Sequence, residues 1–333
     1  MQVKTVFKLL IITLIISGCG EIRKDKNFLP ASTGKYGEVL VVVDTIYENG
    51  ATGEALDEVF NKIQEGLPKA EPMFRMSTVP PAAFKSILKR GRNILQLSIG
   101  KGKSSNTKVE KDVWAKNQLL INITAANDAK AAEILTKNIQ QIRAQYNAHE
   151  VDDLKAQFAK KPEKKLMQEV LEKHALSITI PPAFLKMKIL ENGIWLQKEK
   201  SIGEHQIIQG LLVYTEPYTS DSTFSKSYFL RSRNRFTESA VLGFRENSYM
   251  RVYQEYEPLV TELNLNGFYS MEYRGLWNMT NDFMGGPFLH YTIVNEDRNE
   301  VIHLDGFVFA PQFQKREYLR ELEAMMKTIR LEN

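Results

Sequence analysis

The two apolar segments before the C-terminal helical region carry the side chains best suited to acid and base chemistry. His290 alternates with apolar residues in the first segment, and His303 and Asp305 do so in the second. Alternate residues of a strand point to opposite faces of a sheet, so these three share the face turned away from the core. A hairpin with a four-residue loop at 296–299 sets His290 opposite Asp305, and a two-residue loop at 296–297 sets it opposite His303. Either pairing makes two imidazoles and a carboxylate neighbours, which suits an acid/base pair.

The preceding segment adds two charged residues to this candidate site. If its polar face joins that of the hairpin, Glu272, Arg274, His290, His303 and Asp305 form one cluster. The alternative is a polar sheet face that a helix partly covers and cross-strand pairs satisfy. Two histidines and one aspartate of open register do not define metal-ligand geometry, so no metal site is predicted. No residue is assigned as catalytic.

A long connection, residues 277–287, precedes the hairpin. It holds Trp277, Phe283, Met284, Gly285 and Gly286. Exposed aromatic side chains beside glycines suit a recognition loop. The alternative is a wide turn whose two large aromatic side chains fill the edge of the core, which their usual burial favours.

Two other segments are interpreted as solvated surface. Gly102 is followed by Lys and Ser, as at the end of a phosphate-binding loop, but position 97 is Leu where the motif needs glycine, so no nucleotide site is predicted. Arg231, Arg233 and Arg235 form a short basic run, for which a solvated helix face is expected.

The N-terminus has the pattern of a bacterial lipoprotein signal. Lys4 and Lys8 precede a short apolar core, and small residues precede Cys19, so residues 1–18 are predicted to be a signal peptide. About eight apolar residues are too few for a membrane span, which needs roughly 20. We expect Cys19 to carry acyl chains such as palmitate and to anchor the chain in the lipid bilayer. Gly20 lacks the usual inner-membrane retention signal, and Glu21 is the only acid before Arg23, so no acidic surface-export run is present. We therefore expect the outer membrane, with the protein facing the periplasm.

Cysteine count and charge exclude several functions. Cys19 is the only cysteine, so a disulfide, a thiol nucleophile and a thiolate metal site are excluded. The chain has 44 basic and 40 acidic residues; without Lys4 and Lys8 the balance is 42 to 40. A charge this small does not recruit nucleic acid, and export removes the nucleotide pool. No cofactor is predicted.

Two domains are expected to position these residues. Residues 19–35 read as a tether, residues 36–150 as a first α/β domain, and residues 151–175 as a helical connector that breaks at Pro162. Residues 176–333 then form a second α+β domain, an antiparallel sheet closed by a C-terminal helix over residues 314–330. The fold class is therefore α+β, with two α/β-type domains.

The C-terminal third also carries a resemblance. Its segments RGLWNMTNDFMGGPFLHY and VIHLDGFVFAPQFQKREYLRELEAMM resemble an uncharacterised family of Gram-negative envelope lipoproteins, described only as a domain of unknown function. The connection at 277–287 is the most specific part. At the level of fold, the second half is loosely similar to the α/β/α sandwich of extrinsic photosystem subunits. The first resemblance implies an envelope location and no particular activity.

Two functions remain open at this point. The first is a non-enzymatic binding or accessory protein whose second domain binds an envelope protein or a ligand. The alternative is a hydrolase of envelope glycans or peptides that uses Glu272, His290, His303 and Asp305. A groove beside the histidines favours the enzyme, whereas an apolar patch around Trp277 and Phe283 favours the binding protein.

Overall fold

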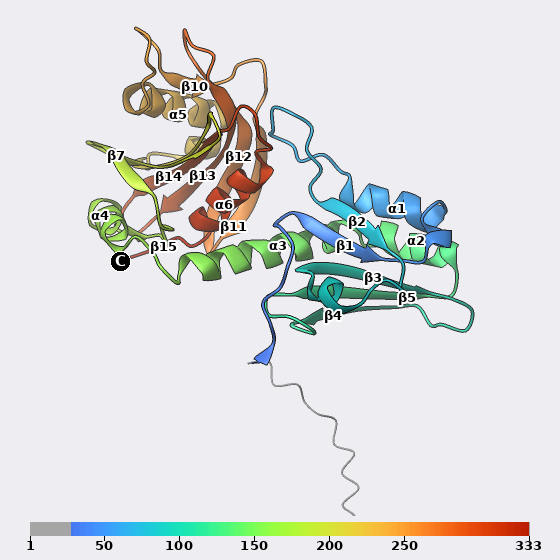
Figure 1. Cartoon of the computed structure of the whole chain (residues 1–333). Helices are drawn as coiled ribbons and strands as arrows, with labels where there is room; N and C mark the ends of the chain where they lie inside the picture. The colour runs from blue at the N-terminus through green and yellow to red at the C-terminus, as the bar shows by residue number, and fades with distance from the viewer. Residues whose placement is uncertain (1–27, 333) are drawn as a thin grey trace, which may run out of the picture.

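The computed structural model describes residues 28–332 and divides them into two domains (Figure 1). This part of the chain forms six α-helices and two main sheets, one in each domain. The signal peptide and Cys19 predicted from the sequence lie outside the described residues. No helix within the described range is long and apolar enough to cross a membrane.

The first domain is built on a five-stranded sheet. Its strands are β1 (Glu38–Val42), β2 (Arg75–Val79), β3 (Asn93–Ile99), β4 (Asn106–Lys111) and β5 (Leu119–Ala125), in the order β2-β1-β3-β5-β4. All pairings are parallel except that of β4 with β5. The β-branched run of β1 is buried between two apolar clusters, as expected for a strand covered on both faces.

Two helices of this domain are joined at their first turns. In α2 (Asp128–Lys137) the side chain of Asn127 accepts the backbone N–H of Lys130 and caps the helix. The carboxylate of Asp128 accepts the first N–H groups of α1 (Ala51–Phe60), those of Ala51 and Thr52, both at 3.0 Å. One acidic side chain therefore caps α1 and fixes it against α2.

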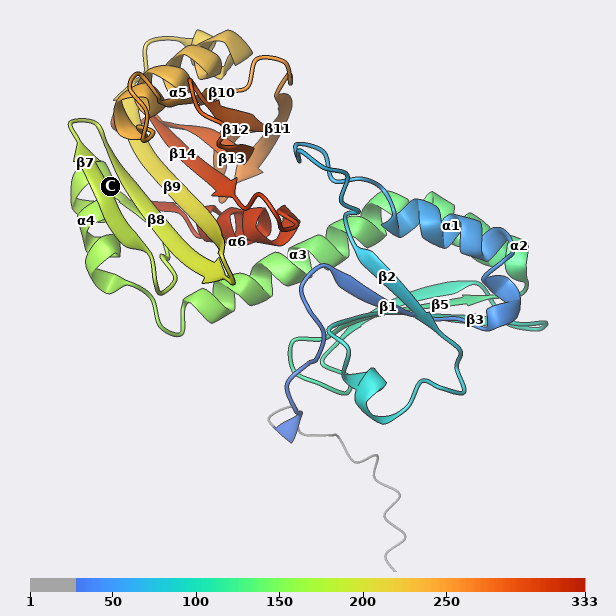
Figure 2. The ribbon, with the colours of Figure 1, turned by 45° about the horizontal axis from the view of Figure 1, so that its top comes forward.

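Helix α3 (Ile139–Phe158) passes from the first domain to the second (Figure 2). Ile142 and Tyr146 in its first half belong to the core of the first domain, and Val151 and Leu154 in its second half pack with Ala324 of α6. The predicted connector is therefore wrong in its first part, because residues 151–158 continue α3. The expected break at Pro162 separates α3 from α4 (Lys164–His174).

The predicted tether is also too long at its C-terminal end. Ala31 forms a β-bridge with Lys116, and Thr33 forms one with Gly91. These contacts attach residues 31–33 to the first domain, because their backbone groups find partners in its loops.

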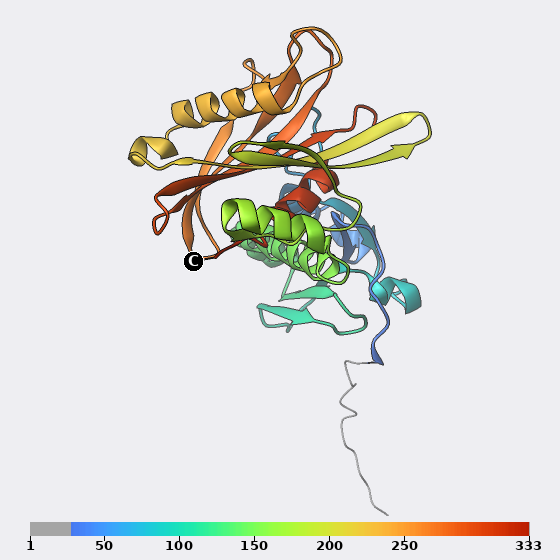
Figure 3. The same ribbon diagram turned by 90° about the vertical axis from the view of Figure 1, so that its left-hand side faces the viewer.

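The second domain is an antiparallel sheet with helices on both faces (Figure 3). Strand β12 (Phe268–Met279) pairs with β13 (Gly285–Asn295), and β13 pairs with β14 (Glu300–Phe309). Outward from β14 lie β9 (His205–Pro217), β8 (Gly193–Ile202) and β7 (Leu185–Leu190); on the other side β10 (Met250–Val252) and β11 (Leu259–Leu265) both pair with β12. Two short strands, β6 (Leu176–Ser177) and β15 (Arg330–Leu331), form a separate pair.

Each face of this sheet has its own core. Helix α6 (Arg316–Met326) covers one face with Leu319, Leu322 and Met326, together with α4. Helix α5 (Lys226–Ala240) covers the other face with Phe229 and Phe236. The sequence-based fold class, an α+β chain whose second domain ends in a helix on an antiparallel sheet, is confirmed.

Buried ionic contacts connect the two domains. The carboxylate of Glu71 accepts the backbone N–H groups of Lys315 and Arg316 at the start of α6, at 2.7 and 3.0 Å. Arg320 of α6 lies 2.5 Å from Glu150 of α3, and their side chains expose only 4% and 0% of their surface. The position of one domain on the other therefore depends on charges that water does not reach.

Candidate functional site

The β13–β14 hairpin places His290, His303 and Asp305 together inside the second domain. The strands pair His290 with Asp305, and the loop between them covers residues 296–299, so the four-residue alternative is the correct one. His290 Nδ1 lies 2.9 Å from a carboxylate oxygen of Asp305, and His290 Nε2 lies 3.1 Å from Nδ1 of His303. Asp305, His290 and His303 thus contact one another in series.

Arg233 of α5 supplies the positive charge that this buried carboxylate requires. Its Nε and Nη2 donate to the two oxygens of Asp305 at 2.6 and 3.1 Å, and neither side chain is exposed at all. The guanidinium also lies 4.1 Å from the ring centroid of Phe288. The expectation of a solvated helix face is therefore wrong for Arg233, although Arg231 and Arg235 on either side are exposed.

Beyond His303, the series of contacts continues through Ser232 to Glu216 of β9. Ser232 Oγ lies 3.5 Å from Nε2 of His303 and donates to Glu216 at 2.8 Å. The Tyr228 hydroxyl donates to the same carboxylate oxygen at 2.7 Å, and Arg235 pairs with the other. We call the set Arg233, Asp305, His290, His303, Ser232 and Glu216 the buried polar network.

Sequence reasoning missed the members of this network that come from α5 and β9. A usable signal was the helical spacing of residues 229, 232, 233, 236 and 237, all of which are buried in α5. That spacing places Arg233 on the same face as two phenylalanines. A buried arginine then predicts a buried carboxylate opposite it.

Burial decides the protonation state of the network. It lowers the pKa of His290 to about 4 and lowers that of His303, so both rings are neutral at neutral pH. Burial also opposes the ionisation of Asp305, but the Arg233 guanidinium and the His290 hydrogen bond hold the pKa of this carboxyl below its ordinary value. The network therefore holds an ion pair and two uncharged imidazoles.

The same burial limits what the network can do chemically. An Asp–His contact followed by a second histidine and a serine contains the groups of a nucleophilic triad. However, His290, His303 and Asp305 expose none of their surface, Ser232 exposes 2%, and α5 lies over them. Because a substrate must reach the nucleophile, this closed arrangement fits a stabilising role rather than a reactive one.

The network predicts a loss of stability in mild acid. The pKa of His290 falls from 6.5 in the unfolded chain to about 4 in the folded protein, so the unfolded chain takes up a proton at a higher pH than the folded protein does. This difference lowers the free energy of unfolding by up to roughly 3 kcal/mol in acid. The contribution of neutral His290 to the free energy of unfolding is fully present above pH 6.5 and is lost as the pH falls toward 4. Urea unfolding at pH 7 and pH 5 should show the loss, and His290→Gln should reduce the difference.

A matched control for this experiment is the exposed His205, since His205→Gln should leave the pH dependence as in the unaltered protein. Equal free energies of unfolding at pH 7 and pH 5 in the unaltered protein would contradict the assignment of two neutral buried histidines.

Glu272 and Arg274 do not join the histidines. Strand β12 pairs Tyr273 with His290 and Glu272 with Tyr291, so Tyr273 shares the face of the network and the two charged residues face α6. There Arg274 donates to Glu272 at 2.7 Å and to Glu323 of α6 at 2.9 Å. The five-residue cluster is therefore corrected to two groups on opposite faces, because the β12–β13 register turns the polar side of β12 away from that of the hairpin.

The candidate recognition loop divides in a similar way. Trp277 is 2% exposed and its Nε1 donates to the carbonyl of Val308 at 3.3 Å, whereas Phe283 is 85% exposed. Gly285 and Gly286 begin β13, and a Cβ on Gly286 would lie 1.9 Å from the Val308 carbonyl oxygen. Trp277 therefore fills the core as the alternative reading expects, while Phe283 and its neighbour Met284 lie at the surface turn.

An apolar pocket opens beside this turn. It has a volume of about 550 Å³ and lies on the α5 face of the sheet. Its sides come from the α5–β10 connection and the β12–β13 turn, and its base comes from β8, β9, β12 and β14. The aromatic and methionine side chains that line it are Trp195, Trp277, Phe244, Phe283, Phe307, Phe309, Met187, Met250, Met279 and Met284.

The two surface segments around this apolar pocket are exposed and held together. Phe244 exposes 98% of its surface, and Leu242 of the same connection exposes 60%. The backbone N–H of Thr280 donates to the carbonyl of Tyr249 at 2.9 Å, and its hydroxyl donates to that of Asn247 at 2.9 Å. The pocket is thus shaped in advance by contacts between its own edges.

Comparisons with known proteins place the chain among uncharacterised sequences. Residues 32–159 match one domain of unknown function (DUF8532), and residues 163–328 match another (DUF4837). The two matches support an uncharacterised protein family and agree with the two structural domains. No curated protein matches the chain.

Solved structures give only distant likenesses. The Ran-binding protein Mog1p of Saccharomyces cerevisiae has a TM-score of 0.31 at 10% identity, over 47% of this chain and 90% of its own. The lipid transfer and protein localization domain of human StarD13 has a TM-score of 0.20 at 10% identity, over 50% of this chain and 95% of its own. Likenesses this weak carry neither fold nor function to this chain.

Proposed function

We propose that the protein is a non-enzymatic binding or accessory protein that holds apolar side chains of a protein partner in the apolar pocket of its second domain. The observation that carries this proposal is the pair of highly exposed aromatic side chains, Phe244 and Phe283, on two connected surface segments around that pocket. Large apolar groups kept in water at one place are typical of an interaction site.

The composition of the pocket supports a protein partner. Methionine and aromatic side chains are enriched in protein interfaces, and methionine adapts its shape to different apolar groups. Polar side chains at the edge, among them Gln206 and Arg245, surround the apolar centre. Because the surface segments are already tied together through Thr280, binding costs little ordering of the loops.

We do not propose the hydrolase alternative. It requires a substrate to reach His290 and His303, and both are enclosed beneath α5. Glu272, one of the two carboxylates it would use, lies on the opposite face of the sheet.

We further propose that the protein acts at the outer membrane, facing the periplasm, and is held there by acylated Cys19. The support is the signal-like sequence before this cysteine and the absence of an acidic run after it. Mass spectrometry of the N-terminal peptide tests the acylation, and protease treatment of intact cells tests the periplasmic location.

Loss of the two exposed aromatic side chains should abolish partner binding without unfolding the protein. We expect Phe244→Ser with Phe283→Ser to remove the partner recovered by cross-linking in intact cells, because both side chains leave water only on binding. Their exposure also means that the free energy of unfolding should change by less than about 0.5 kcal/mol. The measurement is affinity purification of the cross-linked protein followed by mass spectrometry.

The matched control is Phe28→Ser, which removes a phenylalanine that precedes the first domain and is likewise 85% exposed. This variant should retain the partner. If the double variant recovers the same partner in the same amount as the unaltered chain, the pocket is not the binding site. Trp277 is unsuitable for this test because its replacement would disturb the core.

A further inference from the structure

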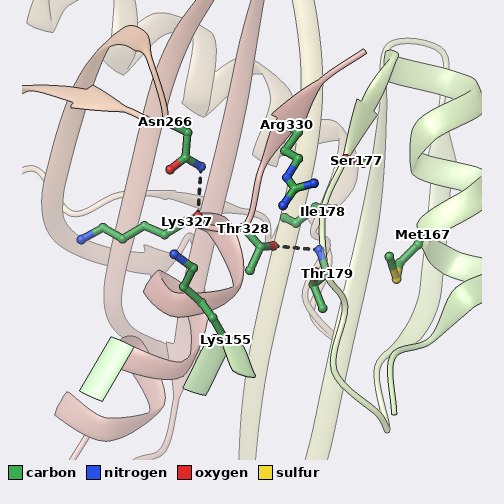
Figure 4. A pocket seen from close by; sticks show the side chains of 9 residues that line it. All are labelled: Lys155, Met167, Ser177, Ile178, Thr179, Asn266, Lys327, Thr328 and Arg330. Carbon is green, nitrogen blue, oxygen red and sulfur yellow. Dashed lines mark hydrogen bonds between the residues drawn. The ribbon is translucent and has the colours of Figure 1, made fainter. Parts of the chain in front are cut away.

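A second cavity lies on the opposite side of the same sheet, between α3, α4 and the end of α6 (Figure 4). Its volume is about 570 Å³, and three cationic residues line it: Lys155, Lys327 and Arg330. They come from α3, from the residue after α6, and from β15. Figure 4 shows the guanidinium of Arg330 directed toward Thr328, the amino group of Lys155 beside the stem of Lys327, and the amino group of Lys327 directed away from Arg330. We call this cavity the cationic pocket.

The positive charge of the cationic pocket is poorly compensated. Among the described residues that line it there is no Asp or Glu, and Arg330 makes no ion pair within the described part of the chain. Lys155 lies 3.5 Å from Asp152, which is 66% exposed and therefore well screened by water. Lys327 pairs with Glu323 at 2.5 Å, but this carboxylate also accepts Arg274. An anion in the cavity would give Arg330 a partner of opposite charge.

Hydrogen bonds of two polar side chains fix the walls of the cationic pocket. The Thr328 hydroxyl accepts the backbone N–H of Thr179 at 2.8 Å and donates to the carbonyl of Met325 at 2.7 Å, which holds the two walls together. Asn266 donates to the carbonyls of Lys327 and Ile329, and so fixes the segment that carries Arg330. These contacts fix the backbone of the segments that carry Lys327 and Arg330.

Two hydroxyls and two apolar side chains complete the lining. Ser177 and Thr179 are half-buried and add O–H donors beside the cations. Met167 and Ile178 form an apolar wall. A cavity of this size therefore has room for an anionic group and for part of the organic molecule that carries it.

The α3–α4 connection and the first turn of α4, the helix that carries Met167, add exposed lysines on either side of one acid, Glu163. The connection between α3 and α4 adds Lys160 and Lys161, and the first turn of α4 adds Lys164 and Lys165; all four are exposed. Basic side chains grouped in this way attract anions over a distance of about one Debye length, roughly 8 Å at physiological salt.

We propose that the cationic pocket binds the phosphate group of an organic ligand. The planar guanidinium of Arg330 can donate two parallel hydrogen bonds to phosphate oxygens, while Lys155 supplies a point charge and the hydroxyl groups supply further donors. The apolar wall then contacts the carbon atoms next to the phosphate. The same chemistry is found in phospholipid headgroups and in soluble phosphate esters. This proposal is independent of the partner site on the other face of the sheet.

Calorimetric titration of the full chain in detergent tests the proposal and separates the two ligand sources. The probes are a water-soluble short-chain phosphatidylglycerol, glycerol 3-phosphate and inorganic phosphate, at low ionic strength. We expect one-to-one binding of at least one probe, weakened about tenfold by Lys155→Gln with Arg330→Gln, because each substitution removes a charged contact. Stronger binding of the phosphatidylglycerol assigns a lipid headgroup, and stronger binding of glycerol 3-phosphate assigns a soluble ester.

The matched control removes two exposed lysines from the β3–β4 connection of the first domain, Lys101→Gln with Lys103→Gln. It makes the same change in net charge and should leave binding unchanged. Arg330→Lys keeps the charge and loses the planar fork, so it should weaken binding less than Arg330→Gln does. The proposal is overturned if none of the three probes binds saturably, or if the control variant loses as much affinity as the pocket variant.

Discussion

Replacing Arg233 with methionine is expected to lower the free energy of unfolding by about 3–5 kcal/mol, since it leaves Asp305 without its positive partner in a site that water does not reach. The carboxylate must then either stay charged in an apolar environment or take up a proton. Both outcomes are costly, because the His290 ring beside it is neutral and supplies no compensating charge. Equilibrium unfolding in urea at neutral pH measures the loss.

Two further variants make this prediction specific. Arg231→Met removes the same charge from an exposed position two residues away on α5, and should change stability by less than about 0.5 kcal/mol. The double variant Arg233→Met with Asp305→Leu removes both charges and should recover much of the loss, as buried ion pairs often tolerate apolar replacement. A loss below about 1 kcal/mol for Arg233→Met alone would mean that water reaches the carboxylate after all.

Replacing Arg320 with methionine should uncouple the two domains. Glu150, which exposes none of its surface, would lose the guanidinium at 2.5 Å and keep only the hydrogen bonds from Gly37 and Asn93. Burial already raises the pKa of Glu150, so loss of the cation should raise it further. We expect a loss of about 3–5 kcal/mol and separate thermal transitions for the two domains where the unaltered chain has one. Differential scanning calorimetry records both.

The control for the interface is Arg298→Met. Arg298 pairs with Glu300 at 3.0 Å, but its side chain is 44% exposed, so its loss should cost less than about 1 kcal/mol and leave one transition. A single, slightly shifted transition for Arg320→Met as well would show that other contacts, such as those of Glu71, are sufficient to couple the domains.

Sequence alternation gave the hairpin correctly because it depends on local geometry alone. Side chains two residues apart in a strand share a face, so His303 and Asp305 had to lie together, and each hairpin loop length implies one pairing with His290. The closing helix was equally clear, since Leu319, Leu322 and Met326 repeat at helical spacing. These features need no knowledge of distant parts of the chain.

The features that the sequence did not reveal depend on contacts between distant segments. Strand β12 has a charged face and an aromatic face, and only its register with β13 decides that the face with Glu272 is turned to α6. Strand β4 was not expected because it is a polar edge strand with Val109 as its one apolar residue. The buried state of Arg233 follows from the packing of α5 over Asp305, more than 70 residues away.

The path of α3 has a practical consequence for dividing the gene into pieces. A boundary at Pro162, between α3 and α4, would give a first fragment in which Val151 and Leu154 are exposed to water. Their apolar neighbour Ala324 would be in the second fragment. A boundary at residue 150 would instead remove Asp153, which accepts the Tyr36 hydroxyl at 2.7 Å. Neither fragment keeps its own core closed, so we expect both to aggregate when expressed alone. The two halves match separate sequence domains, yet we expect that they must be produced as one polypeptide.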